Sequence, residues 1–476
     1  MESDSQKRRK FWNFRYSAET EIGNDDNLST SLSEYYKKNA RHCCEFEKKS
    51  VILQWKNQGQ IRVNREREIG RLMVSKADRP LNRIMVLTGA RQVGKTTIIR
   101  DYFPDYTYLS VENPALVNRL KSMGASEWAI AYPKAALDEV QKEPVLIEFV
   151  KSVYDEYQKT KYLLTGSSQL LLMQKVRESL AGRCRIYDIY PLTLPEIESK
   201  DIKLHHSVWQ KMLLHEDYEL MPNLTVLPNY ANRLVAYNYY LRFGGYPALV
   251  NETLTDEERW EWLLDYVRTY LERDIRDIAS IRDLEPFVKL QQAMAIQTGQ
   301  TVTESSLANL IGVSPKTAKQ YLNYLYISYQ TIVLQSWSRN PNKRLVRAPK
   351  VHFIDHGVLQ AVLQRRGGLS GNEYESAIVS EIYKQAHAVA ADARFYHLRT
   401  QDGKEVDLLV ETPDGYYAFE IKLADKMQPT DGRHLRKLED IVIDKPILRR
   451  FVVSNDWQTK ELETGITAIH AALLLG

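Results

Sequence analysis

The sequence contains few cysteines and no long apolar run. Only three cysteines occur among 476 residues, Cys43, Cys44 and Cys184, and no two of them have the CxxC spacing. We therefore expect neither a disulfide framework nor a zinc site, and the low cysteine content fits a reducing compartment. No apolar run approaches the roughly 20 residues of a membrane helix, and the first residues lack the apolar segment of a secretion signal. We expect a cytoplasmic protein without a membrane partner.

Net charge is also small, at +4, so bulk charge indicates no class of partner. The hydrophobic fraction of 43% and the charged fraction of 26% are those of an ordinary globular protein. At roughly 100–200 residues per domain, the length predicts about three domains.

The pattern along the chain predicts an α/β protein with five parts. Alternating strand and helix patterns after the first of these parts predict a parallel sheet with helices on both faces. The predicted parts are an amino-terminal extension (1–57), a P-loop ATPase core (58–200), a helical lid (201–300), a winged helix-turn-helix (301–365) and a carboxy-terminal α/β domain (366–476).

Residues 89–96, GARQVGKT, match the phosphate-binding pattern G-x-x-x-x-G-K-[ST] between a predicted strand, 84–88, and a predicted helix. The glycines let the backbone curl so that successive N–H groups face phosphate oxygens. We expect Lys95 to reach the β and γ phosphates of ATP and Thr96 to ligate Mg²⁺. The expected nucleotide-binding residues are Gly89, Ala90, Arg91, Gln92, Val93, Gly94, Lys95, Thr96 and Thr97.

Strands are also predicted at 107–111 and in the AAL that precedes Asp138. A second element follows the phosphate-binding pattern about forty residues later, in LDEVQ at 137–141. Asp138 is expected to hold Mg²⁺ and Glu139 to polarise the attacking water. Elsewhere, such an acidic pair more often begins a solvated helix. The next strand, 162–165, ends near Ser167 and Ser168, which either contact the γ phosphate or cap the following helix.

Several motifs in order, GARQVGKTT, LDEVQ, LLTGSSQLLL and SLAGR…YPLTLPEI, resemble a prokaryotic family of AAA-like ATPases that ends in a domain of unknown function. The resemblance continues through FGGYPALV and RAPKVHFIDHGVL and covers about residues 58–425. It implies that Arg183, and less directly Arg273, senses the phosphate or acts as an arginine finger. A finger acting on a second chain implies a homo-oligomer. The alternative for both residues is a surface or interdomain salt bridge.

Residues 303–326 predict a helix-turn-helix in which Ser314 caps the second helix and Pro315 begins it. Lys316, Thr317, Lys319 and Gln320 are expected on its exposed face. Residues 305–354 contain no Asp or Glu but several Lys and Arg, a pattern typical of nucleic-acid binding. The alternative is a packing module of the ATPase lid.

The segment VDLLVETPDGYYAFEIK at 406–422 predicts a hairpin with Asp407 on one strand and Glu420 and Lys422 at the end of the next. Residues two apart in a strand share a face. Glu375, on a preceding helix, is the expected third carboxylate, whereas Glu381 is expected to point away. The set resembles the PD-(D/E)xK nuclease active site, which implies Mg²⁺ at Asp407 and Glu420 and catalysis by Glu375, Asp407, Glu420 and Lys422. A domain that only binds nucleic acid remains the alternative.

Together these features predict an ATPase that couples nucleotide state to DNA binding and Mg²⁺-dependent DNA cleavage. Two other hypotheses stay open. One is a nucleotide-gated regulatory or defence switch that binds without cutting, and the other is a transcription regulator that uses ATP to control its winged helix.

Overall fold

The computed structural model describes residues 65–166, 169–199, 203–270, 284–340, 342, 344, 347–400 and 402–476. The predicted extension 1–57 and the candidate residues Ser167 and Arg273 lie outside this part of the chain. Within it, no helix has the length and apolar composition that a membrane span requires.

The front part is built on a five-stranded parallel sheet with the order β2-β3-β4-β1-β5. Its strands are β1 (Ile84–Gly89), β2 (Thr107–Ser110), β3 (Lys134–Asp138), β4 (Lys161–Thr165) and β5 (Cys184–Ile189). The four strands predicted from the sequence are confirmed, as is the α/β class. β5 was not predicted. Its residues alternate between apolar and charged, and they follow the SLAGR motif, which was interpreted only through its resemblance to the ATPase family.

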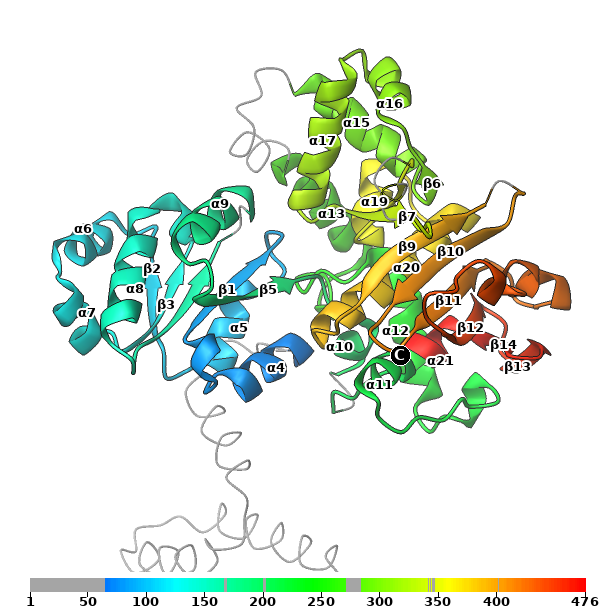
Figure 1. Ribbon diagram of the computed structural model, residues 1–476, viewed down its shortest axis with the longest axis horizontal. Coiled ribbons are helices and arrows are strands. Elements are labelled where there is room, and N and C mark those ends of the chain that lie inside the picture. Colours follow the sequence, from blue (N-terminus) through cyan, green and yellow to red (C-terminus); the bar gives the residue numbers. More distant parts are fainter. Residues whose placement is uncertain are drawn as a thin grey trace, which may run out of the picture. The chain divides into compact units, whose positions relative to one another are not determined.

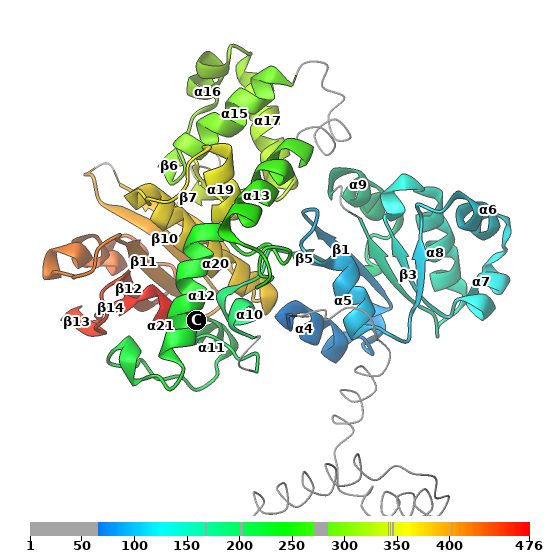
Figure 2. The same cartoon turned by 180° about the vertical axis from the view of Figure 1, so that it is seen from behind.

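Helices cover both faces of this sheet, because its interior strand β1 is apolar on both sides. In β1, Ile84 and Val86 pack with one buried cluster, whereas Met85 and Leu87 pack with another. The first face is covered by α6 (Pro114–Ser122), α7 (Ala125–Ala131), α8 (Val145–Glu156) and α9 (Gln169–Ser179). The second is covered by α4 (Glu68–Lys76) and α5 (Lys95–Tyr102), as Figures 1 and 2 show.

A helical segment follows the front sheet. It contains α10 (Leu194–Glu198), α11 (Val208–Leu214), α12 (Tyr230–Phe243) and α13 (Asp256–Tyr270). The motifs FGGYPALV and FIDHGVL lie against each other here, since the Gly245 N–H donates to Asp355 Oδ2 at 2.7 Å. A side chain on Gly244 would collide with this carboxylate, because its Cβ would lie 2.1 Å from Asp355 Oδ1. Asp355 also caps α19 (His356–Val362).

The helix-turn-helix consists of α16 (Glu304–Ile311) and α17 (Pro315–Ile327), with Ser314 accepting the Thr317 N–H as predicted. α15 (Glu285–Ile296) packs against both helices, so it belongs with this unit and not with the predicted lid at 201–300. The unit is completed by three antiparallel strands, β6 (Gln300–Thr301), β7 (Thr331–Ser336) and β8 (Lys350–Phe353).

The carboxy-terminal part adds strands to the same sheet. β7 pairs in parallel with β9 (Arg394–Arg399), which gives nine strands in the order β13-β14-β12-β11-β10-β9-β7-β8-β6. The predicted boundary between residues 365 and 366 therefore divides one continuous sheet. Its other elements are α20 (Gly371–Ala388), β10 (Glu405–Glu411), β11 (Tyr416–Ile421), β12 (Ile447–Ser454), β13 (Lys460–Glu463), β14 (Ile466–His470) and α21 (Ala471–Leu475).

Between β11 and β12, the chain forms two short 3₁₀ helices, η5 (Pro429–Leu435) and η6 (Leu438–Asp440). The front part has two similar turns, η1 (Pro80–Asn82) and η2 (Val140–Lys142), and a third, η3 (Leu224–Val226), precedes α12.

Candidate nucleotide and carboxylate sites

The phosphate-binding loop connects the carboxyl end of β1 to the first turn of α5. Gly89 has φ of +151°, and a Cβ at this position would lie only 2.2 Å from the Ile189 carbonyl oxygen. Gln92 and Gly94 have φ of 63° and 95°, both in the left-handed region. These turns bring the loop to the amino end of α5, where the first-turn N–H groups have no intrahelical partner and favour an anion.

Lys95 lies inside this loop. Its ammonium donates to the carbonyl oxygens of Gly89 at 2.9 Å and Ala90 at 2.8 Å, and the residue is buried. The lysine thus places a positive charge within the loop, as binding of the β and γ phosphates requires. The loop residues fit ATP on these grounds.

Thr96 and Asp138 come together as predicted, although 42 positions separate them. The Thr96 hydroxyl donates to Asp138 Oδ2 at 3.0 Å. Asp138 ends β3, which is separated from β1 by β4, so the parallel sheet brings both groups to its carboxyl edge. A hydroxyl and a carboxylate are oxygen donors suited to Mg²⁺. Tyr108, which the sequence did not indicate, also donates to Asp138 Oδ2.

Glu139 follows directly and has φ of 58°, in the left-handed region. Gln141 donates to Glu139 Oε2 at 2.5 Å. The same glutamine reaches the end of β4, since a Cβ on Gly166 would lie 2.2 Å from Gln141 Oε1. Gln141 therefore orients the predicted catalytic carboxylate toward the edge where the phosphate loop lies.

Arg67 is a second residue that sequence reasoning missed. It is buried, and its guanidinium donates to the Val93 carbonyl at 2.8 Å and the Tyr190 carbonyl at 2.7 Å. It also pairs with Glu196 at 3.2 Å. Arg67 thus joins the phosphate loop to the segment after β5, and its charge lies beside the loop.

The structure corrects the assignment of Arg183 to this chain's nucleotide site. Arg183 immediately precedes β5, and its neighbour Cys184 pairs with Ile84 at the start of β1. Arg183 is therefore at the amino edge of the sheet, about 15–20 Å from the loop at the carboxyl edge. There it forms an exposed ion pair with Asp155 at 2.8 Å. A role for Arg183 at a neighbouring chain's nucleotide would need a homo-oligomer.

The carboxy-terminal hairpin brings Asp407 and Glu420 to adjacent strands. Leu408 pairs with Phe419, so the next step of the antiparallel register sets Asp407 opposite Glu420. Asp407 Oδ2 accepts the Ile421 N–H at 2.9 Å, and Lys422 donates to Glu420 Oε1 at 2.7 Å.

Glu375 reaches the same place from α20. The charges of Asp407 and Lys422 are close enough to influence its ionisation. Glu381 lies elsewhere, as predicted, since it accepts the Leu194 N–H at 2.6 Å and pairs with Lys384.

An unpredicted lysine lies among these carboxylates. Lys350, on β8, is almost fully buried, and its ammonium is 2.6 Å from Glu375 Oε1 and 3.4 Å from Asp407 Oδ1. It is also 3.8 Å from Glu405 Oε1. The sequence assigned this lysine to a basic stretch for nucleic acid, whereas it is an internal counter-charge.

Burial changes the acidity of this cluster. Burial, and then the charge of Asp407, raise the pKa of Glu375 to about 8 and that of Glu420 to about 7. Burial alone would lower the pKa of Lys350, but Glu375 and Asp407 reverse this effect and raise it. Carboxyl groups outnumber amino groups in this cluster, and the cluster is buried.

These residues fit a divalent metal only in part. Among the described residues, no three His, Cys, Asp or Glu side chains are arranged to hold a metal ion. Carboxylate oxygens are nevertheless the donors that Mg²⁺ prefers. Glu420 Oε2 is buried without a hydrogen-bond partner among the described side chains and backbone. Mg²⁺ at Asp407 and Glu420 stays a prediction, and the Lys350 ammonium is the cation already beside Asp407.

The exposed face of α17 carries Lys316, Lys319 and Gln320 as predicted, whereas Thr317 is half-buried. The basic stretch 305–354 is less basic than its sequence indicates, because carboxylates outside the stretch lie close to two of its residues. Lys319 pairs with Glu304 at 2.6 Å, and Arg344 lies 3.9 Å from Glu411.

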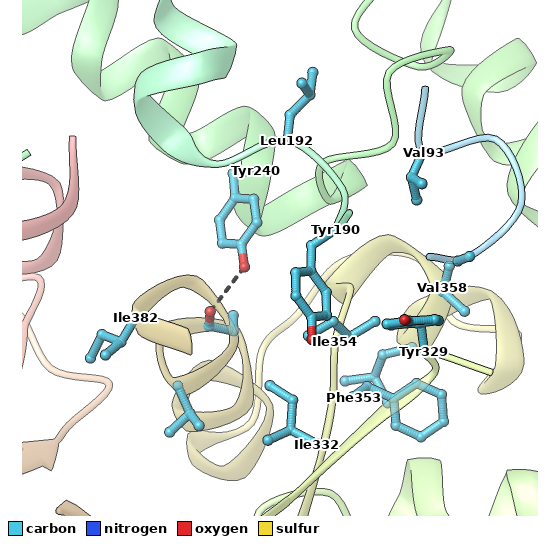
Figure 3. Close-up of a cluster of buried hydrophobic side chains, with 14 of the residues drawn as sticks. Val93, Tyr190, Leu192, Tyr240, Tyr329, Ile332, Phe353, Ile354, Val358 and Ile382 are labelled. Carbon is cyan, nitrogen blue, oxygen red and sulfur yellow. Dashed lines mark hydrogen bonds between the residues drawn. The ribbon is translucent and has the colours of Figure 1, made fainter. Parts of the chain in front are cut away.

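One tyrosine connects this helical unit to the phosphate loop. Tyr329 lies between α17 and β7, and its hydroxyl donates to Asp188 Oδ1 at 2.6 Å. The same hydroxyl is 3.1 Å from the hydroxyl of Thr88, the residue before Gly89. Its ring packs edge-on against Tyr190, with centroids 5.6 Å apart. Figure 3 shows Tyr329, Tyr190 and Val93 within one buried cluster.

Comparison with known proteins supports a nucleotide-binding site in the front part of the chain. Residues 81–198 match the AAA domain family. The P-loop ATPase prediction is thereby supported for this part of the chain. Residues 235–368 and 370–474 match two domains of unknown function, DUF8612 and DUF4143.

Two relatives that match this chain are described only as uncharacterised proteins. An uncharacterised protein of Mycobacterium tuberculosis is 26% identical over 403 residues, which cover 82% of this chain and 81% of that protein. An uncharacterised protein of Methanocaldococcus jannaschii is 26% identical over 294 residues, which cover 58% of this chain and 61% of the relative. A solved Walker-type ATPase of Pyrococcus abyssi has 14% identity and a TM-score of 0.41, covering 63% of this chain and 96% of its own.

Proposed function

We propose that this protein binds and hydrolyses ATP and uses its nucleotide state to control DNA binding and Mg²⁺-dependent DNA cleavage by its carboxy-terminal part. ATP would be held by the phosphate loop and Lys95, with Mg²⁺ at Thr96 and Asp138. Bound Mg²⁺ neutralises phosphate charge as the terminal phosphoryl group is transferred to water. Glu139, oriented by Gln141, accepts a proton from that water.

The observation that carries the coupling is the hydroxyl of Tyr329. It is bonded to Asp188 at 2.6 Å and lies 3.1 Å from Thr88, one residue before the phosphate loop. A shift of the loop on nucleotide binding would therefore act on Tyr329, which lies between α17 and β7. β7 in turn pairs with β8, which carries Lys350, and with β9. β9 pairs with β10, the strand that carries Asp407 of the carboxylate cluster.

DNA binding is supported by the order of elements α15-β6-α16-α17-β7-β8, which is the order expected of a winged helix-turn-helix. The second helix of such a motif enters the major groove. Lys316, Lys319 and Gln320 lie on the exposed side of α17 and are suited to phosphate and base-edge contacts.

Cleavage is supported by the convergence of Glu375, Asp407, Glu420 and Lys422 from a helix and two neighbouring strands. A metal ion held by these carboxylates would activate water and stabilise charge on the scissile phosphate. Lys422 remains partly exposed, with 39% of its side chain accessible, so it is able to meet a phosphate from outside.

A second candidate function is a nucleotide-gated switch that binds DNA without cutting it. Lys350 favours this candidate, because its ammonium already lies beside Glu375 and Asp407, at 2.6 and 3.4 Å. A cluster balanced by an internal lysine is stable without a metal.

The deciding experiment incubates purified protein with linear, circular and single-stranded DNA, with and without Mg²⁺ and ATP. We expect Mg²⁺-dependent products from the wild type, none from Lys422→Ala, and products without ATP dependence from Lys95→Ala. Lys426→Ala, an exposed lysine four positions later, is the matched control and should cut normally. ATP-dependent retardation of DNA with no products would favour the switch, and cutting by Lys422→Ala would refute the assigned site.

A further inference from the structure

Lys350 differs from the other lysine of the carboxylate cluster. It comes from β8, outside the hairpin, and only 3% of its side chain is exposed. Lys422 is 39% exposed and pairs with the neighbouring Glu420 at 2.7 Å. One lysine is thus enclosed by carboxylates, whereas the other borders them.

Three carboxylates are directed at the Lys350 ammonium. Its nitrogen is 2.6 Å from Glu375, 3.4 Å from Asp407 and 3.8 Å from Glu405. Glu375 and Asp407 come from different elements, α20 and β10, so the ammonium joins them. A divalent ion bound to the same oxygens would lie a few ångströms from this positive charge. At that separation two cations repel strongly in a buried region.

The position of Lys350 is fixed by the sheet. β8 pairs with β7 through Lys350–Leu334 and with β6 through Lys350–Thr301. A lysine held between two strands does not leave the cluster by a simple loop movement. Its ammonium leaves by rotation of the side chain or by a shift of β8.

We propose that Lys350 is an internal cation that occupies the divalent-metal position of the carboxy-terminal site, so that a metal binds Asp407 together with Glu375 and Glu420 only when the Lys350 ammonium is displaced. The inference rests on the proposed function, since it concerns the metal of the same site. It assigns Lys350 as a positioning residue that sets metal affinity.

The test measures Mn²⁺ binding by calorimetry without nucleotide, so that the front site holds no metal–nucleotide complex. The variant is Lys350→Met, which removes the charge and keeps the length of the side chain. Lys422→Met is the matched control, because it removes one charge from the border of the same cluster. Asp407→Asn combined with Lys350→Met shows whether the binding is at this site.

We expect Lys350→Met to bind Mn²⁺ about tenfold or more tightly than the wild type, with a clearly smaller gain in Lys422→Met. The gain should disappear in the double variant. No gain in Lys350→Met, or an equal gain in Lys422→Met, would overturn the proposal, because the effect would then be absent or one of general charge.

Stability is checked through the midpoint of thermal unfolding with increasing Mn²⁺. The midpoint should rise more in Lys350→Met than in the wild type, even if the variant is less stable without metal. If Lys350→Met does not fold, Lys350→Gln carries the same test, because glutamine also removes the charge and keeps a polar side chain.

The two proposals fail in different ways. Tighter Mn²⁺ binding by Lys350→Met without DNA cleavage by any variant supports the role of Lys350 and refutes the nuclease function. Cleavage by the wild type with unchanged Mn²⁺ affinity in Lys350→Met refutes the role of Lys350 and leaves the nuclease function standing.

Discussion

Replacing Tyr329 with phenylalanine should disconnect the phosphate loop from the helix-turn-helix unit while leaving both folded. The ring keeps its contact with Tyr190, and only the hydroxyl is lost. A hydrogen bond to a charged acceptor contributes about 1.5–3 kcal/mol, and one to a neutral hydroxyl about 0.5–1.5 kcal/mol. Loss of the contacts with Asp188 and Thr88 should therefore weaken the connection by about 2–4 kcal/mol.

This loss of free energy is as large as the coupling free energy expected between the phosphate loop and the helix-turn-helix unit. Allosteric coupling is typically about 1–3 kcal/mol, which corresponds to roughly 5–150-fold in affinity. The assay compares hydrogen exchange in β7 with and without a slowly hydrolysed ATP analogue. We expect the analogue to change exchange in the wild type and to change it at least about fivefold less in Tyr329→Phe.

The control is Tyr324→Phe, which loses a hydrogen bond from Gln320 within α17 and should respond as the wild type does. Nucleotide affinity should stay within a few-fold in both variants, because each substitution removes only a hydroxyl and leaves the nucleotide-binding residues from 89 to 97 unchanged. A full nucleotide response in Tyr329→Phe would refute the assigned connection, as would the absence of any response in the wild type.

Three further predictions concern single residues. Glu139→Gln should bind ATP normally but hydrolyse it about 10²–10⁴-fold more slowly, because it loses the general base; an unchanged hydrolysis rate would reject this role. Gly89→Ala should lower the free energy of unfolding by roughly 2–4 kcal/mol, because its Cβ would lie 2.2 Å from the Ile189 oxygen. The control Gly182→Ala, whose Cβ would have nothing within 4 Å, should lower it by about 1 kcal/mol. Equal denaturation midpoints of the two variants would contradict the loop geometry. The pKa of Glu375 is raised by burial to about 8, so the folded state holds a proton that the unfolded state releases above the ordinary value of 4.5. The free energy of unfolding should therefore fall as pH rises from about 5 to 8. The fall should be up to about 4 kcal/mol larger in the wild type than in Glu375→Gln. Parallel profiles of stability against pH for the two proteins would disprove the raised pKa.

The phosphate loop could be predicted from the sequence because its function depends on contiguous residues. The spacing of Gly89, Gly94 and Lys95 determines how the backbone curls, and the strand before it and helix after it follow from local pattern. Asp138 was found by its place at the end of a strand in a parallel sheet. The hairpin carboxylates were predictable for a similar reason, since a short turn sets Asp407 opposite Glu420.

Contacts between distant segments could not be predicted in this way. Tyr329 and Thr88 are 241 positions apart, and Lys350 and Asp407 are 57 apart. Nothing local to Lys350 distinguishes it from the other basic residues of its stretch, because its burial depends on how β8 joins the sheet. Arg67 was missed for the same reason.

Arg183 shows how one unrecognised strand changes an assignment. Its role was inferred from a resemblance, without placing the residue on the sheet. Recognition of β5 would have set Arg183 at the beginning of a strand parallel to β1. The phosphate loop follows the end of β1, so the two lie at opposite edges.

The most direct test of the account measures the affinity of the protein for duplex DNA, by fluorescence anisotropy, without nucleotide and with a saturating, slowly hydrolysed ATP analogue. The account predicts at least about a fivefold difference in the wild type and none in Lys95→Ala. Equal affinity of the wild type in the two conditions, or the same nucleotide-dependent difference in Lys95→Ala, would contradict the claim that the front nucleotide site controls DNA binding.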